Sequence, residues 1–390
     1  MNEFIERIDE NFAEDLLKRM IKAPSVNPPG NERGCAEIIQ GELRDLGLKV
    51  DLIEKRDHRT NVVARLKGEK GEPTLLYNGH MDVVPPGHGW SREPFGGEII
   101  GRNLYGRGAA DMKSGLASMI TGIKAIVESG IKLEGDLILT AVADEETGSV
   151  YGTRHLIEMG IRADMAVVSE PTDLRIEIAN KGLLWIKIST HGRGSHASRP
   201  HLGVNAISKM MNVVSALQSI KLEGVNSIFD VPTPTLSVTT IEGGTKVNVI
   251  PDLCTIGVDR RLLPGEDPHI ALQLITDVIN NLKGKDTELN TTLNVLEEWP
   301  PMEISKDEPI VKHLTKAVET VTGRRPNLYG KAAGTDASFL VRDAKIPTAL
   351  FGPGDPSLSH TPDEHVNLDK VTEAAKVFAT LAFNVLKIEN

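Results

Sequence analysis

The sequence predicts an α/β protein with a central mixed sheet between helices and an inserted ferredoxin-like domain. Short apolar runs typical of buried strands alternate with segments whose apolar residues have helical spacing, which predicts the first part. Between Lys181 and Leu296 the order becomes βαββαβ, which is a complete two-layer unit. At 390 residues, of which 40% are hydrophobic, the chain is long enough for two cores. We therefore expect one domain in two parts, residues 1–180 and 297–390, around an insertion at residues 181–296.

The elements of the first domain follow from apolar spacing and from turn residues. Two helices are expected first, over residues 12–21 and 36–46, where Pro24 and Gly47 mark their ends. A later helix begins at Asp111 and stops at Gly130. The expected strands cover residues 50–53, 61–66, 75–80, 137–142, 165–168 and 347–351, and the closing helix covers residues 371–385.

The insertion changes to alternating and amphipathic patterns. Its expected elements are a strand at 184–188, a helix at 206–217, strands at 235–241 and 253–262, a helix at 270–282 and a strand at 289–296. In the 253–262 strand, Cys254, Ile256 and Val258 form the apolar face, so Arg261 points the other way. An arginine there could hold a substrate carboxylate in a bidentate fork, whereas Arg260 would lie on the face beneath the helices or at the strand end.

Charge and cysteine content exclude several classes of partner and site. A net charge of -10 argues against a general surface for nucleic acid or anionic membrane. The sequence starts without a basic and apolar leader pattern and has no stretch long enough to span a bilayer, so we expect a cytoplasmic protein. The two cysteines, Cys35 and Cys254, support neither a disulfide framework nor a thiolate cage. Any metal would be held by nitrogen and oxygen.

Acids and histidines recur where apolar strands end. The set comprises His80, Asp111, Glu146, Glu170 and His360, with Asp82 behind His80 and Glu145 beside Glu146. In open α/β sheets the carboxyl ends of the strands form the ligand crevice, so these side chains should converge.

Two imidazoles and three carboxylates suit a metal centre. Zinc is the first choice, and cobalt and manganese are alternatives that the same ligands accept. Five ligands are too many for one catalytic ion that keeps an open position, so two ions sharing one carboxylate fit the count. Such a pair would activate a water and polarise a carbonyl oxygen. Glu145, which is not needed as a ligand, could take the proton of that water and pass it to a leaving amine.

Each of these residues also has an ordinary interpretation. Glu145 and Glu146 could form a solvated turn, Asp111 could cap a helix, and His360 could be a loop histidine. Each ordinary role is the commoner one for a single residue. Their recurrence in one structural setting favours the metal centre.

Five stretches carry a resemblance to a known family. They are Gly79-His80-Met81-Asp82-Val83-Val84-Pro85, Gly106-Arg107-Gly108 through Asp111-Met112-Lys113-Ser114-Gly115, Asp144-Glu145-Glu146-Thr147-Gly148, Ser169-Glu170-Pro171-Thr172 and Ser359-His360-Thr361. With these motifs the sequence resembles the di-metal M20 metallopeptidases and amidohydrolases, which include acetylornithine deacetylase, succinyl-diaminopimelate desuccinylase, aminoacylase and the glutamate carboxypeptidases. The resemblance covers nearly the whole chain.

The resemblance implies a role for each residue of the set. His80 and Glu170 would hold one ion, Glu146 and His360 the other, and Asp111 would bridge them. Asp82 would orient His80, and Glu145 would be the general acid and base. The insertion would be a lid and dimerisation domain. The implied substrate-binding residues are His196, Asn248, Arg261, Gly334 and Thr335.

We therefore expect a homodimeric hydrolase that cleaves an amide bond next to a free α-carboxylate. The leading substrate class is an N-acyl amino acid, and the alternative within the same chemistry is a dipeptide or the end of a peptide. Outside that chemistry, a non-catalytic relative would show a lost ligand or a replaced Glu145, and neither occurs. A two-metal phosphoesterase is disfavoured by the lid motifs and the acidic charge.

Overall fold

The computed structural model describes residues 4–387, which divide into two compact units. The first unit consists of the chain up to Ile178, Ile304–Tyr329, and the chain from Thr335 onward. The second unit consists of Ala179–Glu303 and Gly330–Gly334. Among the described residues, no helix is both long and apolar enough to cross a membrane.

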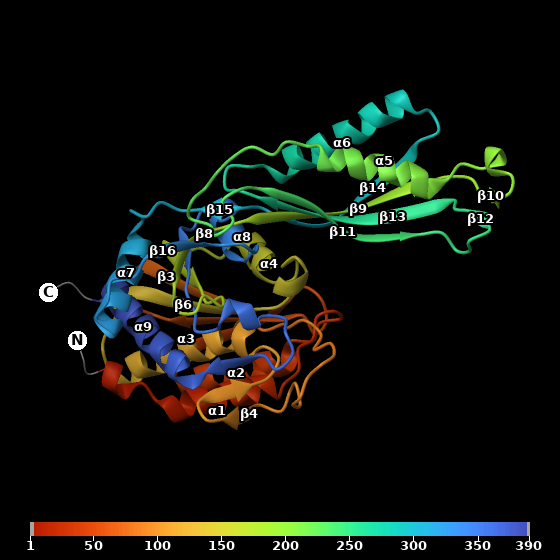
Figure 1. The fold of residues 1–390 in the computed structure, drawn as a ribbon. Coiled ribbons are helices and arrows are strands. Elements are labelled where there is room, and N and C mark those ends of the chain that lie inside the picture. The colour runs from red at the N-terminus through yellow and green to blue at the C-terminus, as the bar shows by residue number, and fades with distance from the viewer. Residues whose placement is uncertain (1–3, 388–390) are drawn as a thin grey trace. The chain divides into compact units, whose positions relative to one another are not determined.

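A mixed sheet forms the centre of the first unit, with strands in the order β1-β2-β6-β3-β7-β17-β8. Figure 1 labels β3, β6 and β8 of this sheet. The four middle strands, β6, β3, β7 and β17, are mutually parallel. The flanking strands pair antiparallel: β1 with β2, β2 with β6, and β8 with β17. The bounds are β1 (Lys49–Glu54), β2 (Thr60–Leu66), β3 (Gly71–His80), β6 (Gly135–Val142), β7 (Met165–Val168), β8 (Ile176–Asn180) and β17 (Thr348–Leu350).

Helices cover both faces of this sheet, as two neighbouring residues of β3 show. The Tyr77 hydroxyl donates to the Phe378 carbonyl at 2.6 Å, while the Asn78 amide donates to the Thr153 hydroxyl at 3.0 Å. Successive strand residues point to opposite faces, so α9 and α4 lie on opposite sides. The helices are α1 (Glu10–Ile21), α2 (Arg33–Asp45), α3 (Ser114–Ser129), α4 (Thr153–Glu158), α7 (Pro309–Thr322), α8 (Ala337–Arg342) and α9 (Leu368–Leu386). The predicted α/β class, with its mixed sheet between helices, is confirmed.

The segment before α3 differs from the prediction. We expected the helix to begin at Asp111, but α3 begins at Ser114, and Asp111 and Met112 have non-helical backbone angles. The amides of Ala110 and Asp111 donate to the carboxylate of Glu364, at 2.8 and 3.0 Å, rather than to backbone carbonyls. Nearby, a small antiparallel sheet has the order β18-β5-β4, formed by β4 (Glu98–Ile100), β5 (Asn103–Tyr105) and β18 (His365–Asn367).

The second unit has the predicted order βαββαβ, and its four main strands are arranged β11-β13-β9-β14. Both helices lie over one face of this sheet (Figure 1), and their apolar residues form one core with it. The elements are β9 (Gly182–His191), α5 (Ala206–Gln218), β11 (Thr235–Gly243), β13 (Leu253–Leu262), α6 (Pro268–Lys285) and β14 (Asn290–Trp299). The last strand therefore ends at Trp299, three residues beyond the expected Leu296.

Short strands complete the structure. β10 (Ser195–His196) pairs with β12 (Val249–Ile250) within the second unit. β15 (Met302–Glu303) pairs with Ala179 and Asn180 at the end of β8, and β16 (Leu328–Lys331) also pairs with β8.

Candidate active site

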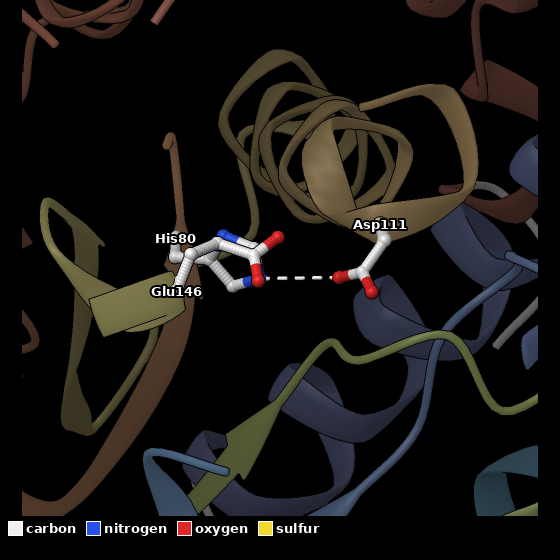
Figure 2. A group of neighbouring side chains, drawn as sticks. All are labelled: His80, Asp111 and Glu146. Atoms are coloured by element: carbon white, nitrogen blue, oxygen red, sulfur yellow. Dashed lines mark hydrogen bonds and ion pairs between the residues drawn. The ribbon is translucent and has the colours of Figure 1, made fainter. Parts of the chain in front are cut away.

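The carboxyl ends of the parallel strands bring the predicted residues of the first unit together. His80 is the last residue of β3, Glu145 and Glu146 lie in the turn after β6, and Glu170 follows β7. Ligand atoms of His80, Asp111 and Glu146 all lie within 4.8 Å of one another (Figure 2). Within residues 4–387 this is the one group of three or more acids, histidines or cysteines that meets that spacing.

Gly79 explains how Asp111 comes so close to β3. A side chain at this position would meet Met112 at 2.5 Å and Leu116 at 3.1 Å. The absence of a side chain at Gly79 thus leaves room for Met112 and Leu116, which follow Asp111, to pack directly on the strand that carries His80.

The carboxylate of Asp111 faces both predicted histidine ligands. Its Oδ1 lies 3.2 Å from His80 Nε2, and its Oδ2 lies 3.6 Å from His360 Nε2. His360 lies in the loop between β17 and β18, with a left-handed φ of +63°, and its Nε2 is also 3.2 Å from Glu146. One oxygen toward each imidazole is the arrangement that a bridging carboxylate needs.

Glu145 is buried beside this cluster. Its Oε2 lies 3.8 Å from His80 Nε2, and its side chain is 10% exposed. Burial raises the pKa of Glu145 well above its usual value, and His80 opposes this shift. The negative charges of Glu170 and Glu146 raise the pKa further, which places Glu170 within electrostatic reach of the same site. A buried carboxyl with a raised pKa suits a general acid and base.

The two histidines respond to the surrounding negative charge. Burial lowers the pKa of His80, but Glu145, Asp111 and Asp82 outweigh it and raise the pKa well above its usual value. The hydrogen bond between His360 and Glu146 raises the pKa of His360 to about 9. Burial raises the pKa of Glu146 despite that bond. Without a cation, the site therefore keeps protons that offset its crowded carboxylates.

These residues fit a divalent metal centre. All the donors are imidazole nitrogens and carboxylate oxygens, and at least three of them already converge on one point. Buried carboxylates this close repel one another, and bound cations would remove that repulsion. Zinc, cobalt and manganese all accept this donor set, so the ligands do not select among them.

Zinc binding is expected to release protons. At pH 7 the raised pKa values keep His80 and His360 protonated, and a metal needs both rings neutral. Loading the protein at pH 7 should therefore release about two protons from these rings. The apparent affinity should rise with pH through about 9, the pKa of His360. Calorimetry in buffers of different ionisation enthalpy measures the release. A His360→Gln variant should release about one proton fewer, and loading without proton release would contradict the prediction.

Asp82 does more in the structure than the sequence suggested. We expected its carboxylate to orient His80, but His80 Nδ1 bonds to the backbone carbonyl of Asp82 at 2.9 Å, and the carboxylate is 3.7 Å away. The carboxylate instead accepts the amides of Glu145 and Glu146, both at 3.0 Å. Asp82 thus fixes the turn that presents both glutamates, because one side chain takes two consecutive amides.

Two residues behind Asp82 were not predicted. Asn27 donates to Asp82 at 2.8 Å, and Arg59 bonds to Glu32 at 3.0 Å and to Asp144 at 2.9 Å. The side chains of this ion-pair group are at most 4% exposed. Asp144 has a left-handed φ of +70° and immediately precedes the Glu145–Glu146 turn. No local motif marks Asn27 or Arg59, because their partners are distant in the sequence.

Replacing Arg59 by methionine should destabilise the protein strongly. The change leaves Glu32 and Asp144 buried without their cation, which costs about 3–5 kcal/mol of the free energy of unfolding. Denaturant unfolding measures this. Arg33→Met is a suitable control, because Arg33 is 46% exposed in its pair with Glu54 and should cost about 0–1 kcal/mol. Equal losses in the two variants would argue against a structural role for the buried group.

The predicted substrate-binding residues lie mostly in the second unit. His196 and Asn248 are exposed, and the Asn248 carbonyl accepts the amide of Ala197. Burial alternates along β13 as predicted, with Arg260 buried and Arg261 on the other face. There, the Arg261 guanidinium is paired with Asp259 at 2.9 Å. Gly334 belongs to the second unit, where a Cβ would meet Trp299 at 3.1 Å, and buried Thr335 belongs to the first.

The fold and the cluster of acids and histidines are those of a metal-dependent hydrolase. Residues 76–384 match the model of peptidase family M20/M25/M40, and the chain belongs to this family, whose members hydrolyse amide bonds.

Curated relatives cover nearly the whole chain. The N-formyl-4-amino-5-aminomethyl-2-methylpyrimidine deformylase of Bacillus subtilis is 31% identical, over 95% of this chain and 94% of its own. The succinyl-diaminopimelate desuccinylase of Rhodospirillum centenum is 32% identical, over 94% of this chain and 95% of its own. Both names describe the removal of an acyl group.

Solved structures share the fold. An M20 family metallo-carboxypeptidase from Sulfolobus solfataricus matches with a TM-score of 0.81 and 22% identity, covering 94% of this chain and 97% of its own. A dinuclear metal-binding peptidase of the M20 family from Bacillus subtilis matches with a TM-score of 0.70 and 18% identity, covering 99% of both chains.

Proposed function

We propose that this protein is a two-metal deacylase that hydrolyses N-acyl amino acids to an amino acid and a carboxylic acid. The observation that carries the proposal is the convergence of His80, Asp111 and Glu146 beside the buried carboxyl of Glu145. The deformylase and desuccinylase names of two relatives support acyl-group removal.

His80 and Glu170 would hold one ion, Glu146 and His360 the other, and Asp111 would bridge the two. The two oxygens of the Asp111 carboxylate support the bridging role, since each lies near a different histidine. When bound, the ions would supply Lewis acidity toward a carbonyl oxygen and would activate a water. Asp82 would act as a positioning residue through the amides of Glu145 and Glu146.

Glu145 would move the proton. As a carboxylate it takes a proton from the attacking water, and as the neutral acid it gives that proton to the leaving amine. Burial beside Glu170 and Glu146 keeps the pKa of Glu145 raised, which makes its carboxylate a stronger base toward the attacking water and holds the proton until the amine takes it. The site would thus use one residue for both transfers.

The second unit would contribute a lid, a dimer contact and substrate-binding residues. The Ser198 amide donates to His196 Nδ1 at 3.1 Å, so the neutral ring carries its proton on Nε2. That proton is the donor needed to stabilise an oxyanion. Asn248, Arg261, Gly334 and Thr335 complete the proposed substrate-binding set, with Arg261 exchanging Asp259 for the substrate carboxylate. Light scattering tests the dimer, and cell fractionation tests the proposed cytoplasmic location.

A substrate panel tests the proposed reaction. N-acetyl and N-succinyl amino acids should be cleaved after zinc, cobalt or manganese is added, and elemental analysis should find two ions per chain. Dipeptides and a phosphate ester serve as the competing substrates. Activity on peptides alone would replace the deacylase by a dipeptidase or carboxypeptidase of the same family.

A further inference from the structure

We propose that Glu364 is a positioning residue that preforms the metal site by holding the turn at residues 106–111, which ends at Asp111. This inference rests on the proposed role of Asp111 as a metal ligand. Glu364 lies four residues after His360 and 253 residues after Asp111, and its side chain is completely buried.

The turn is bound to Glu364 at several consecutive points. Glu364 Oε1 accepts the amides of Gly108, Ala110 and Asp111, at 3.1, 2.8 and 3.0 Å. The backbone carbonyl of Glu364 accepts the amide of Gly106 at 2.8 Å. Four amides of one turn therefore point at one residue, and the backbone of the bridging ligand is among them.

The second carboxylate oxygen fixes the opposite side of the same turn. Glu364 Oε2 is paired with the guanidinium of Arg107, and both side chains are buried. Arg107 also lies over the Trp90 ring, with its guanidinium carbon 5.3 Å from the ring centroid. The Trp90 indole donates to the Pro86 carbonyl at 2.7 Å. The pair thus ties the segment after His80, the turn of Asp111 and the loop of His360 together.

These contacts make Glu364 a support for the ligands rather than a ligand itself. One of its oxygens is occupied by three amides and the other by an arginine. Because the amide of Asp111 is held, the start of its side chain has a fixed position before any cation arrives. The entropic cost of ordering this turn is met during folding, so metal binding does not have to supply it.

Glutamine at position 364 would break this arrangement in either orientation of its amide. If its NH₂ group faces Arg107, two donors oppose each other; if it faces the turn, the NH₂ meets three amide donors. The side chain keeps its volume, so packing is preserved. In the first orientation Arg107, which is part of the turn, loses its buried partner, and in the second the three amides lose their acceptor. Either orientation therefore weakens the hold on the turn, while the bond from the Gly106 amide to the backbone carbonyl remains.

Asp136 provides a matched control. Its carboxylate accepts the Gly68 amide at 2.9 Å and pairs with Arg65 at 2.8 Å, so it also combines a backbone amide with an arginine. It lies in β6 near the end of the strand opposite to Glu145. Asp136→Asn should lower stability while leaving metal binding unchanged.

The experiment compares the full-length wild type, Glu364→Gln and Asp136→Asn. Hydrogen exchange of the metal-free proteins reports the amides of Gly108, Ala110 and Asp111, and zinc titration reports affinity. In the wild type these amides should exchange far more slowly than those of the exposed glycines Gly87 and Gly89. In Glu364→Gln their protection should fall, and zinc affinity should fall by about 10–100-fold, as for other residues that support ligands.

The outcomes separate this inference from the proposed function. Wild-type zinc affinity in a folded Glu364→Gln protein, or fast exchange of the three amides in the metal-free wild type, would overturn the inference alone. A wild type that binds no zinc would overturn the proposed function and the inference with it. The wild-type exchange measurement can overturn the inference even if the variant does not fold.

Discussion

Glu145→Gln is expected to retain both metal ions and to lower kcat by about two to four powers of ten. The proposed ligand set does not include Glu145, so its amide leaves the metal donors in place. Glutamine cannot accept the proton of the attacking water or return it to the amine, so both transfers are lost. Elemental analysis and steady-state kinetics on an N-acyl amino acid measure the two quantities separately.

A control distinguishes this effect from a general loss of charge. Glu158→Gln removes a carboxylate that is 61% exposed in its pair with Lys55 and should leave kcat unchanged. An unchanged kcat in Glu145→Gln would refute the assigned proton transfer. A large loss of metal in that variant would instead make Glu145 a ligand.

Asp111→Asn should have the second large effect, on metal content rather than on proton transfer. The amide presents one oxygen and no charge, so it cannot face His80 and His360 with equivalent oxygens as the carboxylate does. Even residues that merely support ligands are worth about 10–100-fold in affinity, so the loss here should exceed 100-fold. Zinc titration measures this loss.

Chelation provides the comparison for that variant. Metal-free wild type should match the residual activity of Asp111→Asn, and added zinc should restore the wild type but not the variant. Tight binding of two ions by Asp111→Asn would show that another residue bridges them.

Sequence alone could predict the part of the site that follows from strand topology. His80, Glu146 and Glu170 come directly after buried apolar runs, and parallel strands bring such positions to one edge of a sheet. The family resemblance then supplied the assignment of ions to ligands. The sequence also predicted that Arg260 and Arg261 lie on opposite faces of their strand, because strand residues alternate in direction and burial follows that alternation.

Supporting interactions could not be predicted, because backbone groups carry them. Asp82 binds the amides of Glu145 and Glu146, and Glu364 binds those of Gly108, Ala110 and Asp111. A sequence shows the acid but not which amides it meets. The same contacts explain why the helix expected at Asp111 begins at Ser114, since local spacing cannot reveal a partner about 250 residues away.

The position of β17 has a consequence for synthesis of the chain. This strand lies between β7 and β8 in the sheet, and His360 follows it. At about 5–20 residues per second, His360 is made roughly 14–56 s after His80, since 280 residues separate them. Throughout that interval the growing chain lacks one of the parallel strands and one imidazole. If the proposed ligand set is right, a nascent polypeptide cannot assemble the complete metal centre, and its metallation follows translation of the segment that contains β17 and His360.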